Sequence, residues 1–190
     1  MSLLILLVVA VIIVAFWSYL IYASLIRKRN KAQEAFYSID VQLKKRYDLI
    51  PNILTIAQKY MEHEREVLEE VTKLRTQVIG LSSSFENIDR KIALDGEIVK
   101  KMGQIMVTLE NYPQLKADKT MLVAMQTYNE VEEHIAAARR FYNSAANELK
   151  NVVEIFPSSL MARMLNIKTV DFIKATEQER RAIRTNDFLK

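Results

Sequence analysis

The sequence predicts an all-α protein in which an N-terminal transmembrane helix continues into an up-and-down bundle of three to four long helices. Its first 26 residues contain an apolar run without a charged side chain. Only 3 glycines and 3 prolines occur in 190 residues, which leaves few places for turns and favours long helices. After the run, apolar residues recur at steps of three and four, which is the spacing of one helix face.

The apolar run, Ser2 to Ile26, predicts a membrane anchor over residues 1–26. As a helix its about 25 residues reach roughly 37 Å, enough to cross a hydrocarbon core of ~30 Å. Trp17, Tyr19 and Tyr22 lie near its far end, where amphipathic rings favour the membrane interface. A signal peptide cleaved after Ala23 is an alternative, but it would need a basic start and a shorter apolar core. A buried core helix of this length is also disfavoured.

Four basic residues follow the run at once: Arg27, Lys28, Arg29 and Lys31. Lys and Arg close to a membrane helix prefer the cytoplasmic side. We therefore expect a single-pass protein with its N-terminus outside, its helical body in the cytoplasm and the lipid bilayer as its first partner. The sequence contains no cysteine, so the peptide itself must provide the anchor.

The helical bundle is predicted over residues 27–166, followed by a C-terminal tail over 167–190. The first apolar face is Ala32, Phe36, Ile39, Leu43, Tyr47 and Ile50. Pro51 predicts a kink or a break between Asp48 and Asn52, because proline lacks a backbone donor and crowds the preceding turn. The face resumes with Ala57, Tyr60, Val67, Val71, Leu74 and Val78, with Glu64 in a gap. Gly80 to Ser84 is the clearest predicted loop.

A further helix is expected from about residue 86 to Glu110, with Asp95 interrupting its apolar face. We interpret Asp95 as a carboxylate at a bundle edge or paired across helices. That face consists of Ile88, Ile92, Val99, Met102, Met106 and Leu109. Asn111-Tyr-Pro113 ends this helix, and Asp118 is the predicted N-cap of the next.

The helix after Asp118 is the most regular in the sequence and extends to about Phe156. Its apolar seam has heptad spacing and consists of Ala124, Tyr128, Val131, Ile135, Ala138, Tyr142, Ala145, Leu149, Val152 and Phe156. The alanines allow a neighbouring helix to approach closely. Pro157 ends the helix, and a short amphipathic piece follows to about Leu165. The tail either docks as a last helix or stays mobile.

The sequence gives little support for a catalytic site. With no cysteine and only His63 and His134, thiolate sites and histidine-based metal centres are excluded or disfavoured. His63-Glu-Arg-Glu66 resembles a zinc-protease motif, but Val67 stands where the second histidine must be. We therefore predict no enzymatic activity, no catalytic residues, no metal and no cofactor. The net charge of +4 includes the cluster after the anchor, and no basic stripe indicates nucleic-acid binding.

Two polar clusters stand out, around residues 40–52 and 139–143. Asp40, Lys44 and Asp48 follow one another at four-residue steps along one helix face. Arg139 or Arg140 could pair with Asp40, Asp48 or Glu110 across the bundle. The clusters form either an ion-pair network that sets helix register or a ligand site. The candidate structural or interaction residues are Asp40, Lys44, Arg46, Asp48, Pro51, Glu110, Arg139, Arg140 and Asn143.

These clusters carry a resemblance to the LemA family. The matching segments are DVQLKKRYDLIPN (Asp40–Asn52), His63-Glu64, ENYPQLKA (Glu110–Ala117), RRFYN (Arg139–Asn143) and Phe156-Pro157 with Ala162. Asp118 stands where the family commonly has Asn, and Asn166-Ile167 replaces a usual Gly-aromatic pair. The resemblance implies a bacterial single-pass membrane protein with a helical-bundle domain. One branch of the family is associated with magnetosome membranes, and some relatives are lipoproteins outside the cytoplasm.

The leading hypothesis is a membrane-anchored interaction or scaffold protein of the bacterial inner or cell membrane. It would assemble with itself, as a homo-oligomer through the alanine-rich seam, or with a membrane protein partner. The alternative is a ligand- or lipid-responsive adaptor that binds an anionic group near Arg139, Arg140 and Asn143.

Overall fold

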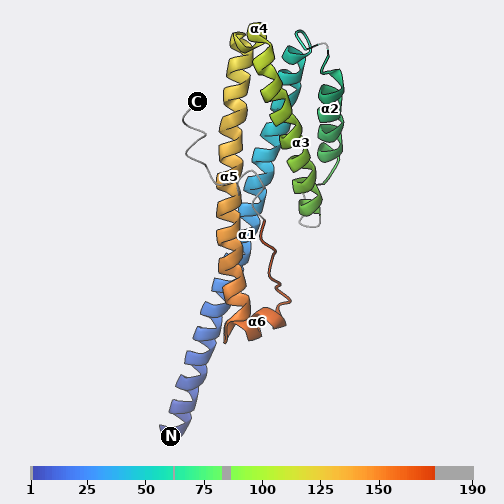
Figure 1. Cartoon of the computed structure of the whole chain (residues 1–190). Helices are drawn as coiled ribbons and strands as arrows, with labels where there is room; N and C mark the ends of the chain where they lie inside the picture. Colours follow the sequence, from blue (N-terminus) through green and yellow to red (C-terminus); the bar gives the residue numbers. More distant parts are fainter. Residues whose placement is uncertain (1, 62, 83–86, 174–190) are drawn as a thin grey trace, which may run out of the picture. The chain divides into compact units, whose positions relative to one another are not determined.

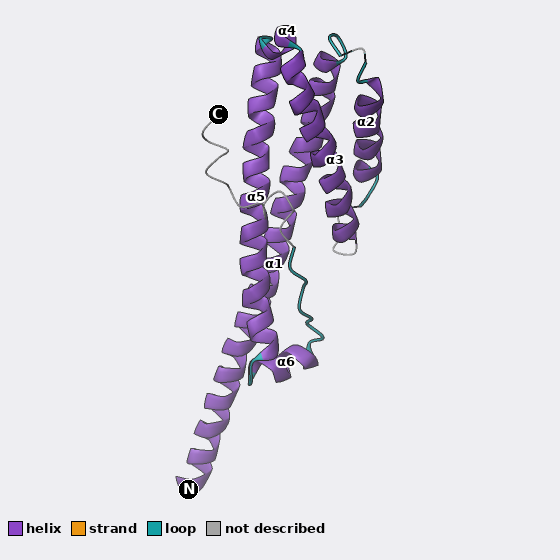
Figure 2. Ribbon diagram, viewed as in Figure 1, coloured by secondary structure: helices purple, strands orange, loops and turns teal. Residues whose placement is uncertain are grey.

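The computed structural model describes residues 2–61, 63–82 and 87–173. These residues form six α-helices and one 3-10 helix, with no strand among them, so the predicted all-α class is confirmed (Figure 2). The elements are α1 (Ser2–Ala57), α2 (Arg65–Ile79), α3 (Ile88–Thr108), η2 (Leu109–Asn111), α4 (Pro113–Lys116), α5 (Lys119–Glu154) and α6 (Ser158–Met164). The part of the tail from 174 to 190 lies outside the described residues.

The chain forms two compact units, and both α1 and α5 contribute to each. Among the described residues, unit 1 contains residues 2–39 and 136–173, and unit 2 contains residues from 40 to 135. The boundaries predicted after residues 26 and 166 follow the anchor and the motifs, and they stay predictions.

The first part of α1 is a candidate membrane anchor. Its most apolar window has a mean hydropathy of 3.0, and none of that window is buried by the rest of the protein. Large apolar side chains that would be costly in water are exposed, such as Leu3 at 79% and Phe16 at 64%. From Leu25 onward the same helix becomes part of the packed core of unit 1. The predicted continuity between anchor and body is therefore confirmed.

Unit 1 packs α1 against the second half of α5. The predicted periodicity places its core residues correctly, because Ala32, Phe36 and Ile39 on α1 are all buried. The opposing buried side chains are Ala138, Tyr142, Ala145, Ala146 and Leu149 on α5. The rings of Phe36 and Tyr142 meet with their centroids 6.4 Å apart. Small alanines let the two helix backbones approach closely around this aromatic pair.

Unit 2 is an up-and-down arrangement of four helical segments: the end of α1, α2, α3 and the first half of α5 (Figure 1). Leu43, Ile50 and Ala57 of the predicted α1 face are buried here. The core also includes Ile53, Leu54, Leu68, Val71, Val78, Ile98, Met102, Ile105, Tyr128, Val131 and Ile135. The number and type of long helices agree with the sequence prediction.

Of the kink or break predicted near Pro51, the break does not occur, because α1 continues through Pro51 to Ala57. Proline lacks the N–H that would bond the carbonyl of Tyr47, four residues earlier. The side chain of Arg75 on α2 replaces that donor, with its Nε 2.6 Å from the Tyr47 carbonyl oxygen. Ile50 and Ile53 on either side of the proline are fully buried, so core packing also holds the helix together. The orphaned carbonyl thus becomes an attachment point between α1 and α2.

The chain instead turns after Ala57, where no glycine or proline marks the place. The amides of Tyr60 and Met61 both donate to the Ala57 carbonyl, at 3.0 and 2.9 Å. Met61 is 1% exposed, so the turn buries an apolar side chain, although a polar surface loop is the usual expectation. Residue 62 lies outside the described residues. The periodicity of residues 57–78 therefore conceals a helix boundary.

Met102 and Leu109 of the predicted α3 face are buried, but the other buried positions are shifted by one residue from it. Its buried positions are Lys91, Asp95, Ile98, Met102 and Ile105, and Leu109 of η2 continues the stripe. The predicted Ile92, Val99 and Met106 are half-buried, and the side chain of Ile88 lies outside the described residues. Asp95 is paired across helices with Arg46, as one of its two interpretations expected, whereas Lys91 was missed because the prediction reserved its position for an apolar residue.

The predicted helix ends agree more closely. The α2 helix ends at Ile79 with Gly80 at its C-cap, and residues 83–84 of the predicted loop lie outside the described residues. Asp118 caps α5 as expected, its Oδ1 accepting hydrogen bonds from the amides of Thr120 at 2.8 Å and Met121 at 3.0 Å. These bonds, led by that from Met121, lower the pKa of the Asp118 carboxyl. The short helix after Pro157 is α6.

Candidate functional site

The most unusual site in the described chain is a buried polar cluster in unit 2, centred on Arg46. Arg46 lies on the core face of α1 and is 1% exposed. Its Nη1 is 2.6 Å from Asp95 Oδ2 on α3, and its Nη2 pairs with Glu132 on α5. A charge this deeply buried is tolerated only when it is paired. One guanidinium therefore connects three of the four helical segments of unit 2.

Two tyrosines complete the Arg46 cluster. The Arg46 guanidinium lies 5.8 Å from the ring centroid of Tyr128, within cation–π range. Burial raises the pKa of both Tyr47 and Tyr128, and the nearby Asp95 carboxylate raises that of Tyr47 further. Burial alone would lower the pKa of Arg46, but the carboxylates of Asp95 and Glu132 raise it overall. All of these shifts keep the arginine charged and the tyrosines neutral.

Several buried polar atoms in and around the Arg46 cluster lack a hydrogen-bond partner. Within the described chain, buried polar atoms without a hydrogen-bond partner are Gln42 Oε1, Arg46 Nε, Tyr47 OH, Asp95 Oδ1 and Tyr128 OH. Each such atom costs about 1–3 kcal/mol relative to its hydrated state. The cluster therefore joins α1, α3 and α5 without adding much stability, and we propose that its role is to set their alignment.

A second ion pair also joins α1 and α3. Lys91 is buried on α3 and pairs with the half-buried Asp40 on α1. Of the predicted α1 cluster, Asp40 and Arg46 thus make contacts across helices, whereas Lys44 and Asp48 are exposed. The sequence reasoning paired Asp40 with arginines and did not identify Lys91, because its position on an apolar face concealed its role.

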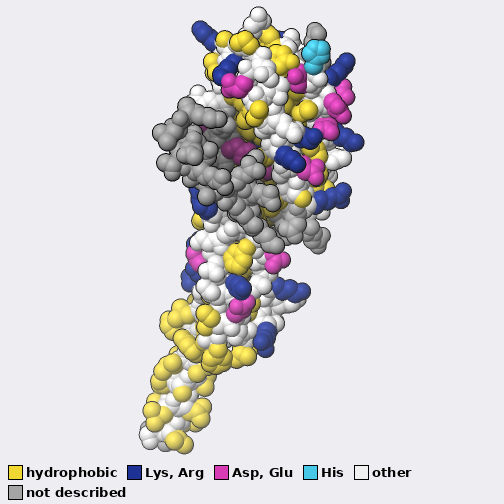
Figure 3. All heavy atoms as spheres, in the orientation of Figure 1, with side chains coloured by type: hydrophobic (Ala, Val, Ile, Leu, Met, Phe, Trp, Pro, Cys, Tyr) yellow, Lys and Arg dark blue, Asp and Glu magenta, His cyan; other side chains and the backbone are white. Residues whose placement is uncertain are grey.

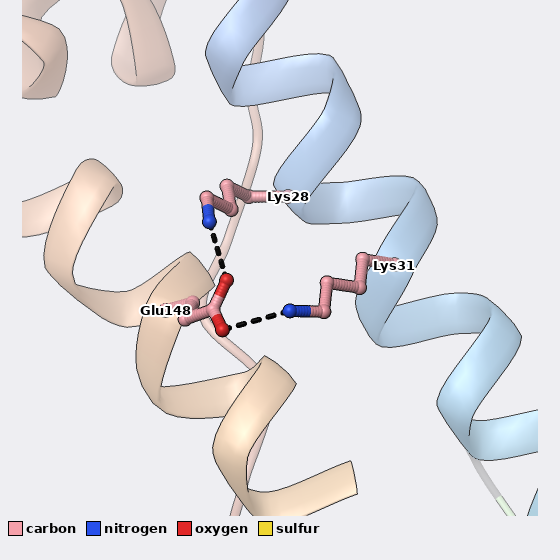
Figure 4. Close-up of polar contacts among 3 residues, drawn as sticks. All are labelled: Lys28, Lys31 and Glu148. Atoms are coloured by element: carbon pink, nitrogen blue, oxygen red, sulfur yellow. Dashed lines mark hydrogen bonds and ion pairs between the residues drawn. The ribbon is translucent and has the colours of Figure 1, made fainter. Parts of the chain in front are cut away.

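Unit 1 contains a cluster of one carboxylate between two lysines, whereas the Arg46 cluster has one arginine between two carboxylates. Glu148 on α5 lies between Lys28 and Lys31 on α1, with one carboxylate oxygen directed at each ammonium group (Figure 4). The Lys31 pair measures 2.8 Å. Hydrogen bonds from Lys28 and then Lys31 lower the pKa of Glu148 to about 2. Two of the four basic residues after the anchor are therefore held by α5, while Arg27 and Arg29 are exposed.

In the 139–143 cluster of α5, Tyr142 and Asn143 hydrogen-bond to the backbone of residues 171 and 173, and we call these contacts the clamp. The amide group of Asn143 makes two bonds to Ile173, donating from Nδ2 to the carbonyl and accepting at Oδ1 from the backbone N–H, both at 2.9 Å. The Tyr142 hydroxyl donates to the Asp171 carbonyl at 3.1 Å. The start of the predicted tail, residues 167–173, is thus docked without forming a helix.

The remaining candidates are less constrained. Arg139 is half-buried and Arg140 exposed on α5. Their predicted pairing with Asp40, Asp48 or Glu110 joins residues of the two units and stays a prediction. Glu110 is exposed and pairs with Lys116 at 2.5 Å next to the η2–α4 turn. Across the described residues, no group of three or more His, Cys, Asp or Glu side chains is arranged to hold a metal ion.

Comparison with known proteins identifies the family to which this chain belongs. The sequence matches the profile of the LemA family over residues 35–187, which is most of the chain. The chain belongs to the LemA family. It is 26% identical over 165 residues to "Protein LemA" of Metamycoplasma hominis, covering 86% of this chain and 73% of that protein. It is 20% identical over 186 residues to the magnetosome proteins MamQ 1 and MamQ 2 of Paramagnetospirillum magneticum, covering 85% of this chain and 68% of each.

The residues that carried the LemA resemblance make specific contacts, one with another motif residue and the others with residues outside the motifs. In unit 2, the hydroxyl of Tyr112 in the NYP segment donates to Glu64 of the His-Glu pair at 2.7 Å. Arg46, Tyr47 and Pro51 of the longest segment all take part in the contacts described above. In unit 1, Tyr142 and Asn143 form the clamp. The LemA motifs in this chain are thus largely sites of helix-to-helix and helix-to-tail attachment.

The two departures from the usual LemA pattern are also explained. Asn166 has a φ of 52°, the left-handed region that glycine enters freely and Asn more easily than most residues. The amide of Ile167 donates to the Ala162 carbonyl at 2.9 Å, which completes a Schellman cap on α6. Ile167 is 9% exposed and fills the buried place of the usual aromatic. Asp118 accepts the N-cap bonds that an Asn oxygen would accept equally well.

Proposed function

We propose that this LemA family protein is a membrane-anchored interaction protein that assembles with further copies of itself and has no enzymatic activity. One observation carries the proposal. The exposed apolar start of α1 and its packed continuation form a single helix with no linker between them. Anchor and folded body are thus mechanically coupled, which suits a protein that displays a helical surface beside a membrane.

The predicted membrane and orientation belong to the same proposal. Residues 2–26 cross the bacterial inner or cell membrane once, with the N-terminus outside and the helical body in the cytoplasm. The exposed Arg27 and Arg29 support this orientation, because they remain at the surface while Lys28 and Lys31 bind Glu148. They would lie among anionic headgroups of the cytoplasmic leaflet.

The surface for self-assembly must differ from the seam that the sequence suggested. The seam from Tyr128 to Leu149 is buried within a single chain, so its alanines are not available to another copy. Exposed apolar side chains occur instead where α3 and α5 flank α4 in unit 2. Val107 is 73% exposed, Leu122 54% and Val123 64%. Anchoring confines these surfaces to one plane, which raises their effective concentration for pairing.

Self-assembly is tested by native mass spectrometry of the full-length protein in a mild detergent, together with crosslinking in membranes. Because the chain lacks cysteine, Val123→Cys introduces one thiol at the proposed contact. We expect a discrete multimer, and a bismaleimide-linked dimer from Val123→Cys. The control is Ser144→Cys, an exposed position elsewhere on α5 that should not crosslink. A monomer at every concentration, with no crosslink at residues 107, 122 or 123, would refute self-assembly.

The alternative, an adaptor that binds an anionic group at Arg139 and Arg140, has less support. Its third residue, Asn143, already uses both atoms of its amide group on the backbone of Ile173. A thermal-shift series with inorganic phosphate and anionic phospholipids separates the two functions. Stabilisation that disappears in Arg140→Gln would favour the adaptor, and no stabilisation by any of these probes would remove it.

A further inference from the structure

The corner between α5 and α6 exposes an unusual row of large apolar side chains. Phe156 is 74% exposed, Leu160 55% and Met164 85%. Leu160 and Met164 are four residues apart on α6 and so share one side of that helix, while Phe156 lies in the turn just before it. Ile155 and Leu165 add further exposed apolar surface, at 60% and 41%. We refer to residues 155–165 as the apolar corner.

The rest of the apolar corner is either buried or polar. Ala162 is fully buried and fixes α6 against unit 1. Ser159 and Arg163 line a hollow of about 660 Å³ whose other walls include Glu154, Lys168 and Asp171. The corner thus has one apolar side, one polar side and a buried attachment. This is the composition of a segment that lies in a membrane interface.

The register of α1 and α5 places the apolar corner beside the end of the anchor. The two helices run in opposite directions within unit 1, and Glu148 is level with Lys28 and Lys31 (Figure 1). Ile155 is seven residues beyond Glu148, roughly 10 Å further along the helix axis. It is therefore level with about residue 22 of α1, among the exposed aromatic residues that include Trp17 and Tyr19.

The molecular surface shows the same continuity. On the face seen in Figure 3, hydrophobic side chains extend from the exposed apolar segment of α1 onto the adjoining part of unit 1 without an intervening band of charge. Charged side chains begin beyond that region. An apolar surface that continues the anchor would meet the same lipid that surrounds the anchor.

We propose that the apolar corner is a second membrane contact, in which Phe156, Leu160 and Met164 insert into the interfacial layer of the bilayer on the side of the folded body. Transfer of these side chains from water to lipid is favourable because it removes exposed apolar surface from water. Arg163, exposed on the same short helix, extends its charged end toward the headgroups. This contact rests on the membrane anchoring proposed above. It would hold unit 1 by two points and fix its rotation about the anchor.

The test uses single spin labels on cysteines introduced at positions 160 and 164 of the full-length protein in phospholipid bilayers. Collision with oxygen, which concentrates in lipid, is compared with collision with a water-soluble nickel chelate. We expect a several-fold higher ratio of oxygen to nickel accessibility at both positions than at Ala137→Cys. Ala137 is exposed on α5 of the same unit and lies away from the corner. The labelled side chains are themselves exposed, so these substitutions do not disturb the core.

A further label at Val11→Cys separates failure of this inference from failure of the anchor itself. A lipid-exposed Val11 with water-exposed labels at 160 and 164 would overturn the second contact and leave the anchor intact. A water-exposed Val11 would refute the anchor and the contact together. Labels at 160 and 164 that are shielded from both reagents and coupled to a second copy's label would identify a protein interface, which also overturns the lipid contact.

Discussion

Each of the two units joins its helices through a cluster of three charged residues. The signs of the charges are reversed between the clusters, and the central residue is buried only in unit 2. In unit 2, one arginine lies between two carboxylates, and Arg46 is 1% exposed. In unit 1, one carboxylate lies between two lysines, and all three side chains are between 31% and 39% exposed. A buried charge that loses its partner cannot be rehydrated, whereas an exposed one can. Burial rather than the number of ion pairs should therefore decide the effect of a mutation.

In each unit, one side chain also hydrogen-bonds to backbone groups that have no partner within a helix. Arg75 in unit 2 donates to the carbonyl that Pro51 leaves without a partner, and Asn143 in unit 1 bonds the irregular segment at Ile173. The first contact lies in the middle of a core helix and the second at the edge of a docked segment. The changes below extend the comparison between the units, beginning with the largest expected effect.

Arg46→Met should be the most destabilising change. It leaves Asp95 buried without a counter-charge, and we expect a loss of about 3–5 kcal/mol in the free energy of unfolding. Urea denaturation in a mild detergent, followed by circular dichroism, measures this loss. Lys45→Met, the exposed neighbour on α1, is the matched control and should change the free energy little. A loss at Arg46 no greater than that of the control would show that the buried cluster is dispensable.

The combined replacement of Arg46, Asp95 and Glu132 by Met, Leu and Met sharpens this test. No buried charge then remains without a partner, so most of the stability lost in the single variant should return. If the cluster sets helix register, the triple variant should show broadened amide resonances in a nuclear magnetic resonance spectrum despite its recovered stability. Sharp, wild-type-like resonances would contradict that role.

Arg75→Met should have the next largest effect. It removes the donor from the Tyr47 carbonyl, and we expect a loss of about 1–3 kcal/mol in the free energy of unfolding. Pro51→Ala restores a backbone donor to that carbonyl, so Arg75→Met should cost less in that background. A double-mutant cycle measured by urea denaturation gives the coupling. Additive effects of the two substitutions would exclude the proposed compensation, and Lys73→Met serves as the exposed control on α2.

Asn143→Ala should have a smaller effect on stability and a local effect on structure. It removes both side-chain bonds to Ile173 and should cost about 1 kcal/mol. Residues 167–173 should then become more sensitive to limited proteolysis, measured by mass spectrometry of the fragments. Asn151→Ala, an exposed position later on α5, should leave the cleavage rate unchanged. Equal cleavage of both variants would indicate that other contacts hold the segment.

Glu148→Gln should have the smallest effect and the clearest dependence on pH and salt. The lowered pKa of Glu148, about 2, means that its contribution is fully present above the ordinary glutamate value of 4.5 and is lost as pH falls toward 2. The difference in Tm between wild type and variant should therefore disappear at low pH. It should also shrink in high salt, because the cluster is partly exposed. A difference independent of pH, or equal to that of Glu133→Gln, would contradict this assignment.

The sequence predicted the helices of unit 1 better than the contacts of unit 2. Periodicity alone identified Phe36, Ile39 and Tyr142 as core residues, and Pro157 and Asp118 marked helix ends correctly. The break offered as one outcome at Pro51 does not occur, because a donor from α2 keeps the helix intact. On α3 the pattern missed Lys91, which occupies a core position. Both outcomes depend on partners distant in sequence, which no local pattern can reveal.

By itself, the sequence determined the all-α class, the candidate anchor and the LemA motifs, because hydropathy, helical spacing and residue identity are local properties. Only the tertiary structure decided which residues the motif residues meet. It paired Arg46 with Asp95, used Arg75 to complete the backbone at Pro51, and used Asn143 to dock residues 167–173. It also buried the alanine seam within one chain and left the apolar corner exposed beside the anchor. Those outcomes depend on which surfaces cover one another, and that is set when the helices pack.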